Sequence, residues 1–475
     1  MTNQARISTG SSQADEILFG GFPANSINII MGEPGTGKTI FAEQMAFHNA
    51  DEARPILYLS TLSEPVSKII KYLQRFQFFD EESVGSKVYY EDIGAELAAR
   101  GIGALVPRLK ESIKSKSPKI IIIDSFKALH DLADSVPEMR RMLFELTGLL
   151  TAYDATVFLL GEYTTEHARV LPEFAIADGI IQFMRSAQST RDERFLRVLK
   201  LRGSAYLEGL HGFRIMSRGL EIYPRLVTPE VPEDYVTVPE RIPTGVDGLD
   251  EMMGGGLWKG SSTLMVGATG TGKTTLGLQF AIEGARQGVP CLYVNFQENP
   301  YQMARSIRNL SGKDAEQTLK SGLNLMYISP VEVQIDSVIV TLFRKIQELK
   351  VERVVIDSVG DLAMSASDPQ RLHDYLYALV QHFAVKSITA MFTLETAAKW
   401  SGEFRDSAET ALARVSYMSD NVLWLALKHD STTRREITCP KARGSEQTLG
   451  TREFYIAQDG LHIESSIPVG ASQGR

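Results

Sequence analysis

The chain has 475 residues, of which 43% are hydrophobic and 23% charged, as in a globular protein of about two or three domains. Its formal net charge of -8 argues against non-specific nucleic-acid binding as the main activity, because such binding needs an excess of Lys and Arg. No stretch is long and apolar enough to span a bilayer, and the first residues lack the apolar run of a signal peptide. Together with two cysteines, Cys291 and Cys439, predicted to be reduced core thiols, these features predict a cytoplasmic protein.

The first half of the chain alternates short apolar runs with stretches of helical spacing. Residues 26–31 form an apolar run that leads into a glycine-rich loop, and residues 39–47 then have helical periodicity. Further apolar runs at residues 56–60, 120–124 and 156–160 predict short buried strands. Strands that are apolar on both faces and separated by helices indicate a parallel sheet covered by helices.

The loop between the first strand and the first helix fits the phosphate-binding pattern G-x-x-x-x-G-K-[ST]. Glycines let the backbone N–H groups face a polyphosphate, the lysine reaches the β- and γ-phosphates, and the hydroxyl holds Mg²⁺. The pattern therefore predicts a nucleotide site with Thr39 as metal ligand. The predicted nucleotide-binding residues are Gly32, Gly35, Thr36, Gly37, Lys38 and Thr39.

Two acidic residues of the first half are candidates for catalysis. Asp124 ends the apolar run at residues 120–124, the Walker B position, where a carboxylate reaches the metal and its waters. The alternative for Asp124 is a helix N-cap. Glu64 follows the second strand and is the candidate that orients or activates water, the alternative being a surface glutamate at a strand-to-helix turn.

A basic motif, Lys200-Leu201-Arg202-Gly203, comes late in the first half. A cation pair on a strand could simply face solvent, but the motif recurs later in the chain, which argues for a function. By analogy with arginine fingers, a cation that reaches the γ-phosphate of a neighbouring subunit would raise the rate by about 10³–10⁵.

The second half of the chain repeats the first. Arg6 to Gly10 reappears as Arg241 to Gly245, and Lys38 reappears as Lys273 at the same spacing. The repeat is a whole domain rather than a short repeat unit. Five prolines between residues 224 and 243 indicate an extended linker at about residues 224–240. We predict domains at residues 1–232 and 233–475, with the boundary near Glu233.

Each candidate of the first copy has a counterpart in the second. Asp357 ends the second Walker B strand, and Lys441 and Arg443 repeat the cation pair. Glu298 is the second water-activating candidate, although it is not in register with Glu64 when Pro65 and Pro300 are aligned. Thr274 is the predicted metal ligand. The predicted nucleotide-binding residues of this copy are Gly267, Gly270, Thr271, Gly272, Lys273, Thr274 and Thr275.

Taken together, these motifs resemble the KaiC-type proteins of the RecA/RadA superfamily over nearly the whole chain. The resemblance rests on the opening motifs at residues 9–10 and 244–250, both phosphate-binding loops, both Asp-Ser strand ends and both K-x-R-G motifs. It implies an α/β fold of two tandem RecA-like P-loop NTPase domains, each a mostly parallel sheet flanked by helices. It also implies a homohexamer of two stacked rings that binds ATP between subunits, where Lys200 and Arg202, or Lys441 and Arg443, reach it from the neighbour.

The chain departs from the clock-type members of this family after the second strand. Those members carry two adjacent glutamates in both domains, whereas this chain has Ser63-Glu64 and Gln297-Glu298. The departure concerns the rate of hydrolysis more than the binding of ATP.

Clock-type members also autophosphorylate an adjacent Ser and Thr in the second domain. Here Ser416 falls at the Ser position, Tyr417 occupies the Thr position, and Ser419 is a further hydroxyl nearby. Ser416 and Ser419 are therefore the candidate phosphorylation sites of a serine autokinase, the alternative being ordinary strand-edge hydroxyls.

Three functional hypotheses follow. The first is a cytoplasmic, hexameric ATPase that uses ATP and Mg²⁺ at two sites per chain. The second is a RecA-like DNA-dependent motor or recombinase, against which the acidic balance and the lack of an added basic domain argue. The third is a signalling scaffold in which ATP holds the ring together and a regulatory partner protein reads its state. The first and third are compatible.

Overall fold

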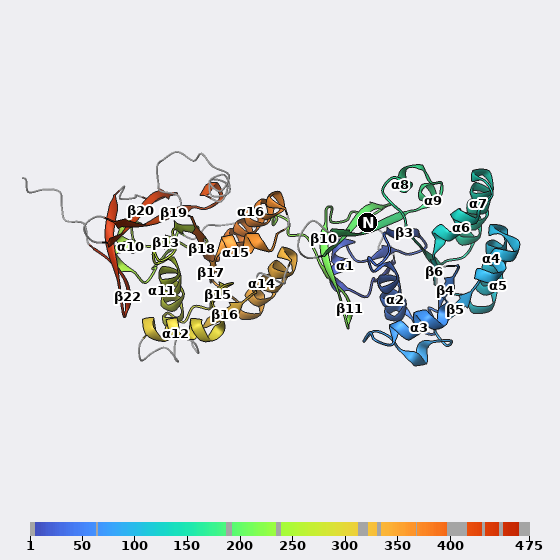
Figure 1. The fold of residues 1–475 in the computed structure, drawn as a ribbon, viewed down its shortest axis with the longest axis horizontal. Coiled ribbons are helices and arrows are strands. Elements are labelled where there is room, and N and C mark those ends of the chain that lie inside the picture. The colour runs from blue at the N-terminus through green and yellow to red at the C-terminus, as the bar shows by residue number, and fades with distance from the viewer. Residues whose placement is uncertain are drawn as a thin grey trace, which may run out of the picture. The chain divides into compact units, whose positions relative to one another are not determined.

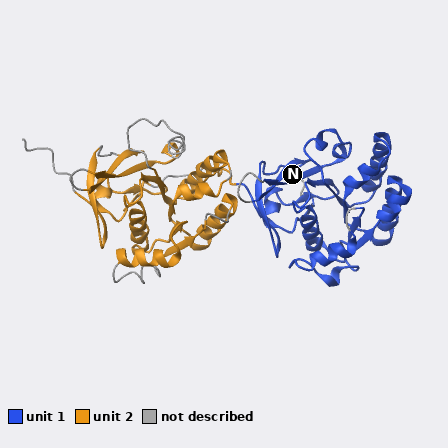
Figure 2. Cartoon of the chain, in the orientation of Figure 1, with its two compact units in different colours: residues 1–225 blue, residues 226–475 orange. Residues whose placement is uncertain are grey.

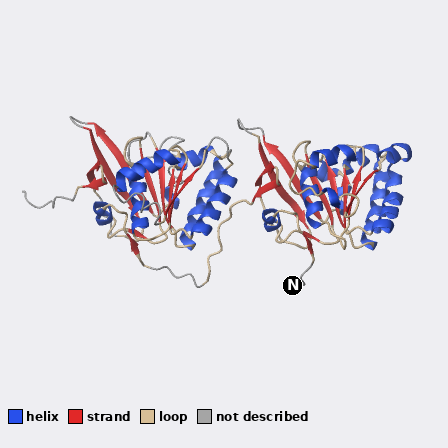
Figure 3. Cartoon of the chain, turned by 90° about the horizontal axis from the view of Figure 1, so that it is seen from below, coloured by secondary structure: helices blue, strands red, loops and turns tan. Residues whose placement is uncertain are grey.

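The computed structural model describes residues 5–62, 65–186, 192–233, 239–311, 322–329, 334–366, 368–396, 416–429, 433–445 and 450–464. The chain divides into two compact units, Met1–Arg225 and Leu226–Arg475 (Figure 2). In each unit helices flank a central sheet (Figures 1 and 3). No helix within the described ranges has the length and apolar character needed to cross a membrane.

The described part of the first unit contains a nine-stranded sheet with the order β11-β10-β9-β8-β3-β7-β6-β4-β5. The strands from β8 to β5 in this order pair in parallel, whereas β8–β9, β9–β10 and β10–β11 pair antiparallel. The predicted mostly parallel sheet is confirmed. The strands are β3 (Ile27–Gly32), β4 (Ile56–Ser60), β5 (Val88–Asp92), β6 (Ile120–Asp124), β7 (Thr156–Gly161), β8 (Gly179–Ser186), β9 (Glu193–Leu201), β10 (His211–Met216) and β11 (Gly219–Tyr223).

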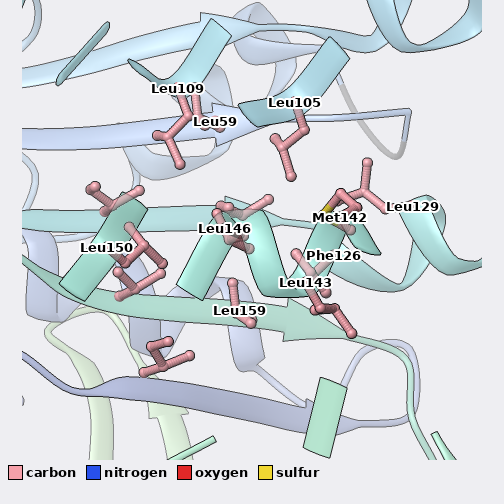
Figure 4. Close-up of a cluster of buried hydrophobic side chains, with 14 of the residues drawn as sticks. Leu59, Leu105, Leu109, Phe126, Leu129, Met142, Leu143, Leu146, Leu150 and Leu159 are labelled. Carbon is pink, nitrogen blue, oxygen red and sulfur yellow. The ribbon is translucent and has the colours of Figure 1, made fainter. Parts of the chain in front are cut away.

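Apolar residues on both faces of this sheet form two core clusters. Along β6, Ile121 and Ile123 belong to one cluster, and Ile120 and Ile122 to the other, because side chains alternate between the faces of a strand. Figure 4 shows the first cluster, in which leucines of α5 and α7 gather over the sheet. The helices are α1 (Ser12–Ile17), α2 (Lys38–Asn49), α3 (Val66–Leu73), α4 (Gly94–Arg100), α5 (Leu105–Lys116), α6 (Phe126–Leu132), α7 (Val136–Ala152), α8 (His167–Val170) and α9 (Glu173–Ile176).

The second unit repeats this topology within its described ranges. Its sheet has the order β22-β21-β20-β19-β14-β18-β17-β15-β16, which matches the order given above for the first sheet strand for strand. The strands are β14 (Ser262–Gly267), β15 (Cys291–Asn295), β16 (Leu323–Tyr327), β17 (Arg353–Asp357), β18 (Thr389–Glu395), β19 (Asn421–His429), β20 (Thr433–Ala442), β21 (Thr451–Ala457) and β22 (Gly460–Ile463). The helices are α10 (Asp247–Met252), α11 (Lys273–Arg286), α12 (Pro300–Ser311), α14 (Ile335–Leu349), α15 (Val359–Met364) and α16 (Pro369–Val385).

Two smaller features complete the units. A short antiparallel pair of strands lies near the start of each unit, β1 (Arg6–Ile7) with β2 (Phe22–Pro23), and β12 (Arg241–Ile242) with β13 (Leu257–Trp258).

Cys291 and Cys439 are buried and free, as predicted. Burial raises the pKa of the Cys291 thiol to about 12 and that of Cys439 to about 11.

Candidate active sites

The first phosphate-binding loop connects β3 to α2 at the carboxyl end of the parallel strands. Gly37 precedes the helix with φ 103°, a left-handed conformation that favours glycine. The side chain of Lys38 folds over the loop, and its Nζ donates hydrogen bonds of 2.9 Å to the carbonyl oxygens of Gly32 and Glu33. The loop therefore curls around the lysine, with strand, loop and helix in the predicted order.

Asp124, at the end of β6, collects hydrogen bonds from two neighbouring elements. Its Oδ2 accepts from Thr39 Oγ1 at 2.9 Å and from Tyr58 Oη at 2.7 Å. A hydroxyl and a carboxylate are oxygen donors of the kind that Mg²⁺ takes, and a Mg²⁺ site needs few protein ligands. Thr39 and Asp124 thus form a donor set that fits the predicted metal.

The second unit reproduces this arrangement. Asp357 Oδ2 accepts from Thr274 Oγ1 at 2.9 Å and from Tyr293 Oη at 2.7 Å, and its Oδ1 accepts from Thr393 Oγ1. Lys273 Nζ donates to the carbonyl oxygens of the second loop at 2.7 and 2.9 Å. Both copies therefore hold the lysine, the hydroxyl and the carboxylate in equivalent contacts.

A cavity lies beside each loop, of about 390 Å³ in the first unit and about 260 Å³ in the second. The first is lined by Pro34, Gly35, Gly37, Lys38, Thr39, Ile40, Ile69, Asp124, Ser125, Gly161, Glu162 and Ile215. The second is lined by Thr269, Gly270, Gly272, Lys273, Thr274, Thr275, Asn295, Gln297, Glu298, Asp357, Ser358, Glu395 and Ile456. Most of the predicted nucleotide-binding residues thus border a cavity.

Burial lowers the pKa of both loop lysines. It lowers the pKa of Lys38, against the opposing effect of the carboxylates of Glu162, Asp124 and Glu33. It also lowers the pKa of Lys273, against Glu395 and Asp357. A bound polyphosphate would add negative charge beside each ammonium group and favour its charged form.

Sequence reasoning missed two pairs of residues at these sites. Glu162, directly after β7, and Glu395, the last residue of β18, line the two cavities, and Tyr58 and Tyr293 hold the Walker B carboxylates. Each pair occupies equivalent positions in the two copies, so the internal repeat could have identified them. Their residue types alone could not, since a tyrosine in an apolar strand is usually a core residue.

The water-activating candidates differ in what the structure describes. Glu64 lies outside the described residues. Glu298 is half-buried at the second cavity, and the backbone N–H groups of Gln297 and Glu298 both donate to Asn295 Oδ1, at 2.9 and 2.7 Å. Asn295 thus fixes the turn that carries Glu298 to the cavity.

The cation pairs lie elsewhere in their own units. Lys200 Nζ donates to the carbonyl oxygen of Ala177 at 2.6 Å, and Arg202 pairs with Asp178 at 3.2 Å. Lys441 and Arg443 repeat this pattern around the turn before β19. None of the four cations is among the described residues that line the cavities.

The candidate phosphorylation sites lie directly against the second cation pair. Lys441 Nζ donates to the carbonyl oxygens of Ser416 and Ser419 at 2.7 and 2.5 Å, and Arg443 donates to that of Tyr417 at 3.1 Å. The Ser419 side chain is fully buried, whereas Ser416 is half-buried and Tyr417 is 75% exposed. Ser416 is therefore the more accessible of the two serines.

A mostly parallel sheet with a phosphate-binding loop between its central strand and a helix defines the class of each unit. Both are RecA-like P-loop NTPase domains, as the resemblance to KaiC-type proteins implied.

The comparison with known families makes the assignment narrower. A family model described as the KaiC ATPase matches residues 7–227 and again residues 242–466. The chain belongs to the KaiC family of ATPases.

Several curated proteins are similar to the chain over most of its length. The circadian clock oscillator protein KaiC of Picosynechococcus sp. is 29% identical over 95% of this chain and 88% of its own length. The circadian clock oscillator protein KaiC 1 of Synechocystis sp. is 28% identical over the same shares of the two chains, 95% and 88%. The KaiC protein of Nostoc sp. is 27% identical, also over 95% and 88%.

Proposed function

We propose that the chain binds Mg·ATP at both loops and hydrolyses it to ADP and phosphate. One observation carries the proposal: the contacts of Lys38, Thr39 and Asp124 recur at Lys273, Thr274 and Asp357. In each copy the lysine donates to carbonyl oxygens of its own loop and the threonine donates to the aspartate, and all three residues line a cavity, an arrangement that suits nucleotide binding. Membership of an ATPase family supports the same conclusion.

The roles of the residues follow from their chemistry. The loop N–H groups and the lysine would hold the β- and γ-phosphates, while the threonine and the Walker B aspartate would hold the metal. Bound Mg²⁺ would neutralise charge on the phosphate oxygens. In the second unit, water attacks the γ-phosphorus, the bond from that phosphorus to the bridging oxygen breaks to release ADP, and Glu298 accepts the proton of the water. Glu64 would have the same task in the first unit.

The proposed assembly is a ring-shaped homohexamer in which each site is completed by a neighbour. The support is that Lys200, Arg202, Lys441 and Arg443 do not line the cavity of their own unit, within the described residues. Arg202 and Arg443 have side chains 63% and 57% exposed, so they can reach outward to a second subunit. Such cations would stabilise charge on the phosphoryl group as it is transferred.

Transfer of the γ-phosphate to a serine of the chain is a second proposed activity, and Ser416 is its favoured acceptor because Ser419 is buried. A regulatory protein that reads the nucleotide or phosphorylation state would then be the natural partner. Mass spectrometry after incubation with Mg·ATP tests this. Phosphate on Ser416 supports the autokinase, and an unmodified chain that still hydrolyses ATP rejects it.

Calorimetry and turnover assays test the ATPase itself. We expect the wild type to bind two nucleotides per chain, and Lys38→Ala or Lys273→Ala to remove one each. If the double variant turned over ATP as fast as the wild type, the assignment of both sites would be wrong. Turnover that rises steeply with DNA at low salt would instead support a DNA-dependent motor.

A further inference from the structure

The second unit contains a side-chain pair at its cavity that the first unit lacks. Gln297 follows β15 and lines the cavity, and its Nε2 donates to both carboxylate oxygens of Asp361, at 3.1 and 3.0 Å. Asp361 lies in the first turn of α15 and is 7% exposed. The pair therefore joins the end of one strand to the helix that follows the neighbouring strand β17, which ends in Asp357.

The chemistry of the pair determines which end of the amide faces the cavity. A carboxylate only accepts hydrogen bonds, so Gln297 must turn its NH₂ group toward Asp361. The amide carbonyl oxygen is then the group that Gln297 can present to the cavity. This oxygen can accept a hydrogen bond from water but cannot take up its proton.

Asp361 is itself held by the start of its helix. Ser358 Oγ accepts from the backbone N–H of Asp361 at 3.2 Å, and the Ser358 hydroxyl donates to Asp361 Oδ2. These reciprocal bonds resemble a capping box, except that the carboxylate accepts from the Ser358 hydroxyl rather than from its backbone N–H. The bonds to Gln297 are additional, and they link the cap to the cavity.

The internal repeat shows that the same topology forms without an acid at the position of Asp361. Counting from the Walker B aspartates Asp124 and Asp357, the residue that corresponds to Asp361 in the first unit is Ala128, which has no acceptor side chain. The first unit nevertheless forms the same strand and the helix α6 after it. A contact specific to the second unit points to a role at the site of that unit.

We infer that Asp361 positions Gln297, and that the carbonyl oxygen of Gln297 orients the attacking water at the second site. The inference rests on the proposed hydrolysis there. A glutamine has this task in other P-loop NTPases. Glu298, the next residue along the chain, is then the proton acceptor, so that orientation and proton transfer belong to adjacent residues. Gln297 touches the water, and Asp361 is a positioning residue that acts through it.

A double-mutant cycle in kcat tests this division of roles. Lys38→Ala serves as the parent, because it confines turnover to the second site. Asp361→Ala and Gln297→Ala should each lower kcat between about 10- and 100-fold, the range expected when a reacting group is misplaced. KM and the nucleotide Kd should stay unchanged. The variant with both changes should be no slower than Gln297→Ala alone, because Asp361 has no route to the water without Gln297.

A matched control separates positioning from helix capping. Asp368 caps α16 through a 2.9 Å bond from the backbone N–H of Gln370, and it does not line the described cavities. Asp368→Ala should therefore lower Tm with kcat unchanged. If Asp361→Ala does not fold, Asp361→Asn takes its place in the cycle, since Asn can still accept at the cap but offers Gln297 one oxygen instead of two.

The outcomes distinguish the two levels of the proposal. If the Lys38→Ala parent binds nucleotide but does not hydrolyse it, the proposed function of the second site fails, and the inference with it. If the parent hydrolyses ATP but the effects of Asp361→Ala and Gln297→Ala on kcat are multiplicative in the double variant, the two residues act independently. The role of Asp361 through Gln297 is then rejected, and the proposed function stands. Loss of Tm without loss of kcat rejects it equally, because Asp361 would then be a cap only.

Discussion

Tyr58 Oη donates a 2.7 Å hydrogen bond to Oδ2 of Asp124, the atom that also accepts from Thr39. Burial raises the pKa of the Tyr58 hydroxyl well above its usual value, so that the group stays protonated and continues to donate. Tyr293 and Asp357 repeat the bond in the second unit. A buried donor thus fixes the orientation of each carboxylate that we assign to the metal.

Replacing this donor should weaken both stability and metal binding. Tyr58→Phe leaves the ring in place and removes one hydrogen bond to the half-buried carboxylate of Asp124, so we expect a loss of about 1–2 kcal/mol in the free energy of unfolding. Apparent Mg²⁺ affinity in the presence of ATP should fall by about 10-fold or more, as for other residues that orient metal ligands. Urea denaturation and a Mg²⁺ titration measure the two effects.

Tyr89→Phe is the control for that change. Tyr89 Oη donates to the carbonyl oxygen of Ser86 at 2.8 Å in an exposed turn, away from the first cavity. Its loss should cost less than about 0.5 kcal/mol and leave Mg²⁺ affinity unchanged. Equal Mg²⁺ affinities in the two variants would show that Tyr58 does not orient Asp124.

Glu43 should make the stability of the first unit depend on pH. Its side chain is fully buried on α2, and burial raises its pKa to about 8, against a lowering effect of the bond from Tyr90 and with a smaller raising effect of Asp124. The folded chain therefore keeps a proton that the unfolded chain releases above about pH 4.5. The contribution of Glu43 to the free energy of unfolding is therefore complete below about pH 4.5. It decreases as the pH rises, by at most about 1.4 kcal/mol per pH unit, until the pH passes about 8.

Glu43→Gln should remove this dependence. Denaturation of the wild type and the variant at pH 5 and pH 8.5 should show a gap that grows in favour of the variant at the higher pH. The second unit supplies an internal control, because the buried Leu278 stands at the corresponding position of α11 and cannot titrate. A pH dependence that is identical in the two proteins would mean that Glu43 is already ionised in the fold.

A buried ion pair should be important for the stability of the second unit. Asp336 on α14 is 1% exposed and accepts from Arg371 on α16 at 2.6 Å, and also from Tyr375. Asp336→Ala would leave the Arg371 charge buried without this partner, at an expected cost of about 3–5 kcal/mol. The exposed pair of Lys127 and Asp131 is the control, since Asp131→Ala should cost less than about 1 kcal/mol. Equal losses in urea denaturation would contradict the distinction.

The sequence allowed the fold to be predicted because its signals are local. Apolar runs at residues 120–124 and 354–357 mark strands buried on both faces, and each loop lysine sits between a strand and a helix. These patterns depend on neighbouring residues alone. The duplication then made each assignment more specific, because both copies contain the same elements in the same order.

The contacts between distant side chains could not be predicted in this way. Gln297 meets Asp361 only because β15 and β17 are neighbours in the sheet, with Asn295 opposite Asp357. Strand order is not readable from apolar runs. The bonds from Lys441 to backbone carbonyls could not be predicted from the sequence either, because any residue type can supply a carbonyl oxygen.

Subunit mixing should reveal whether the cations act on a neighbour's ATP. A variant with Arg202→Ala and Arg443→Ala keeps intact loops but lacks these cations, and should lose about 10³-fold or more in turnover. A variant with Lys38→Ala and Lys273→Ala keeps the cations but lacks the phosphate-binding lysines. Each protein alone should be nearly inactive.

In a mixed ring, an intact loop of the first variant can meet intact cations of the second. Random assembly of equal amounts would complete about one quarter of the interfaces in a closed ring, so mixing should restore a corresponding share of the turnover. A chain that carries all four changes cannot complement either protein and is the control. If the mixture were no more active than its separate components although the subunits exchange, Arg202 and Arg443 would act only within their own chain, where they contact Asp178 and the Tyr417 carbonyl.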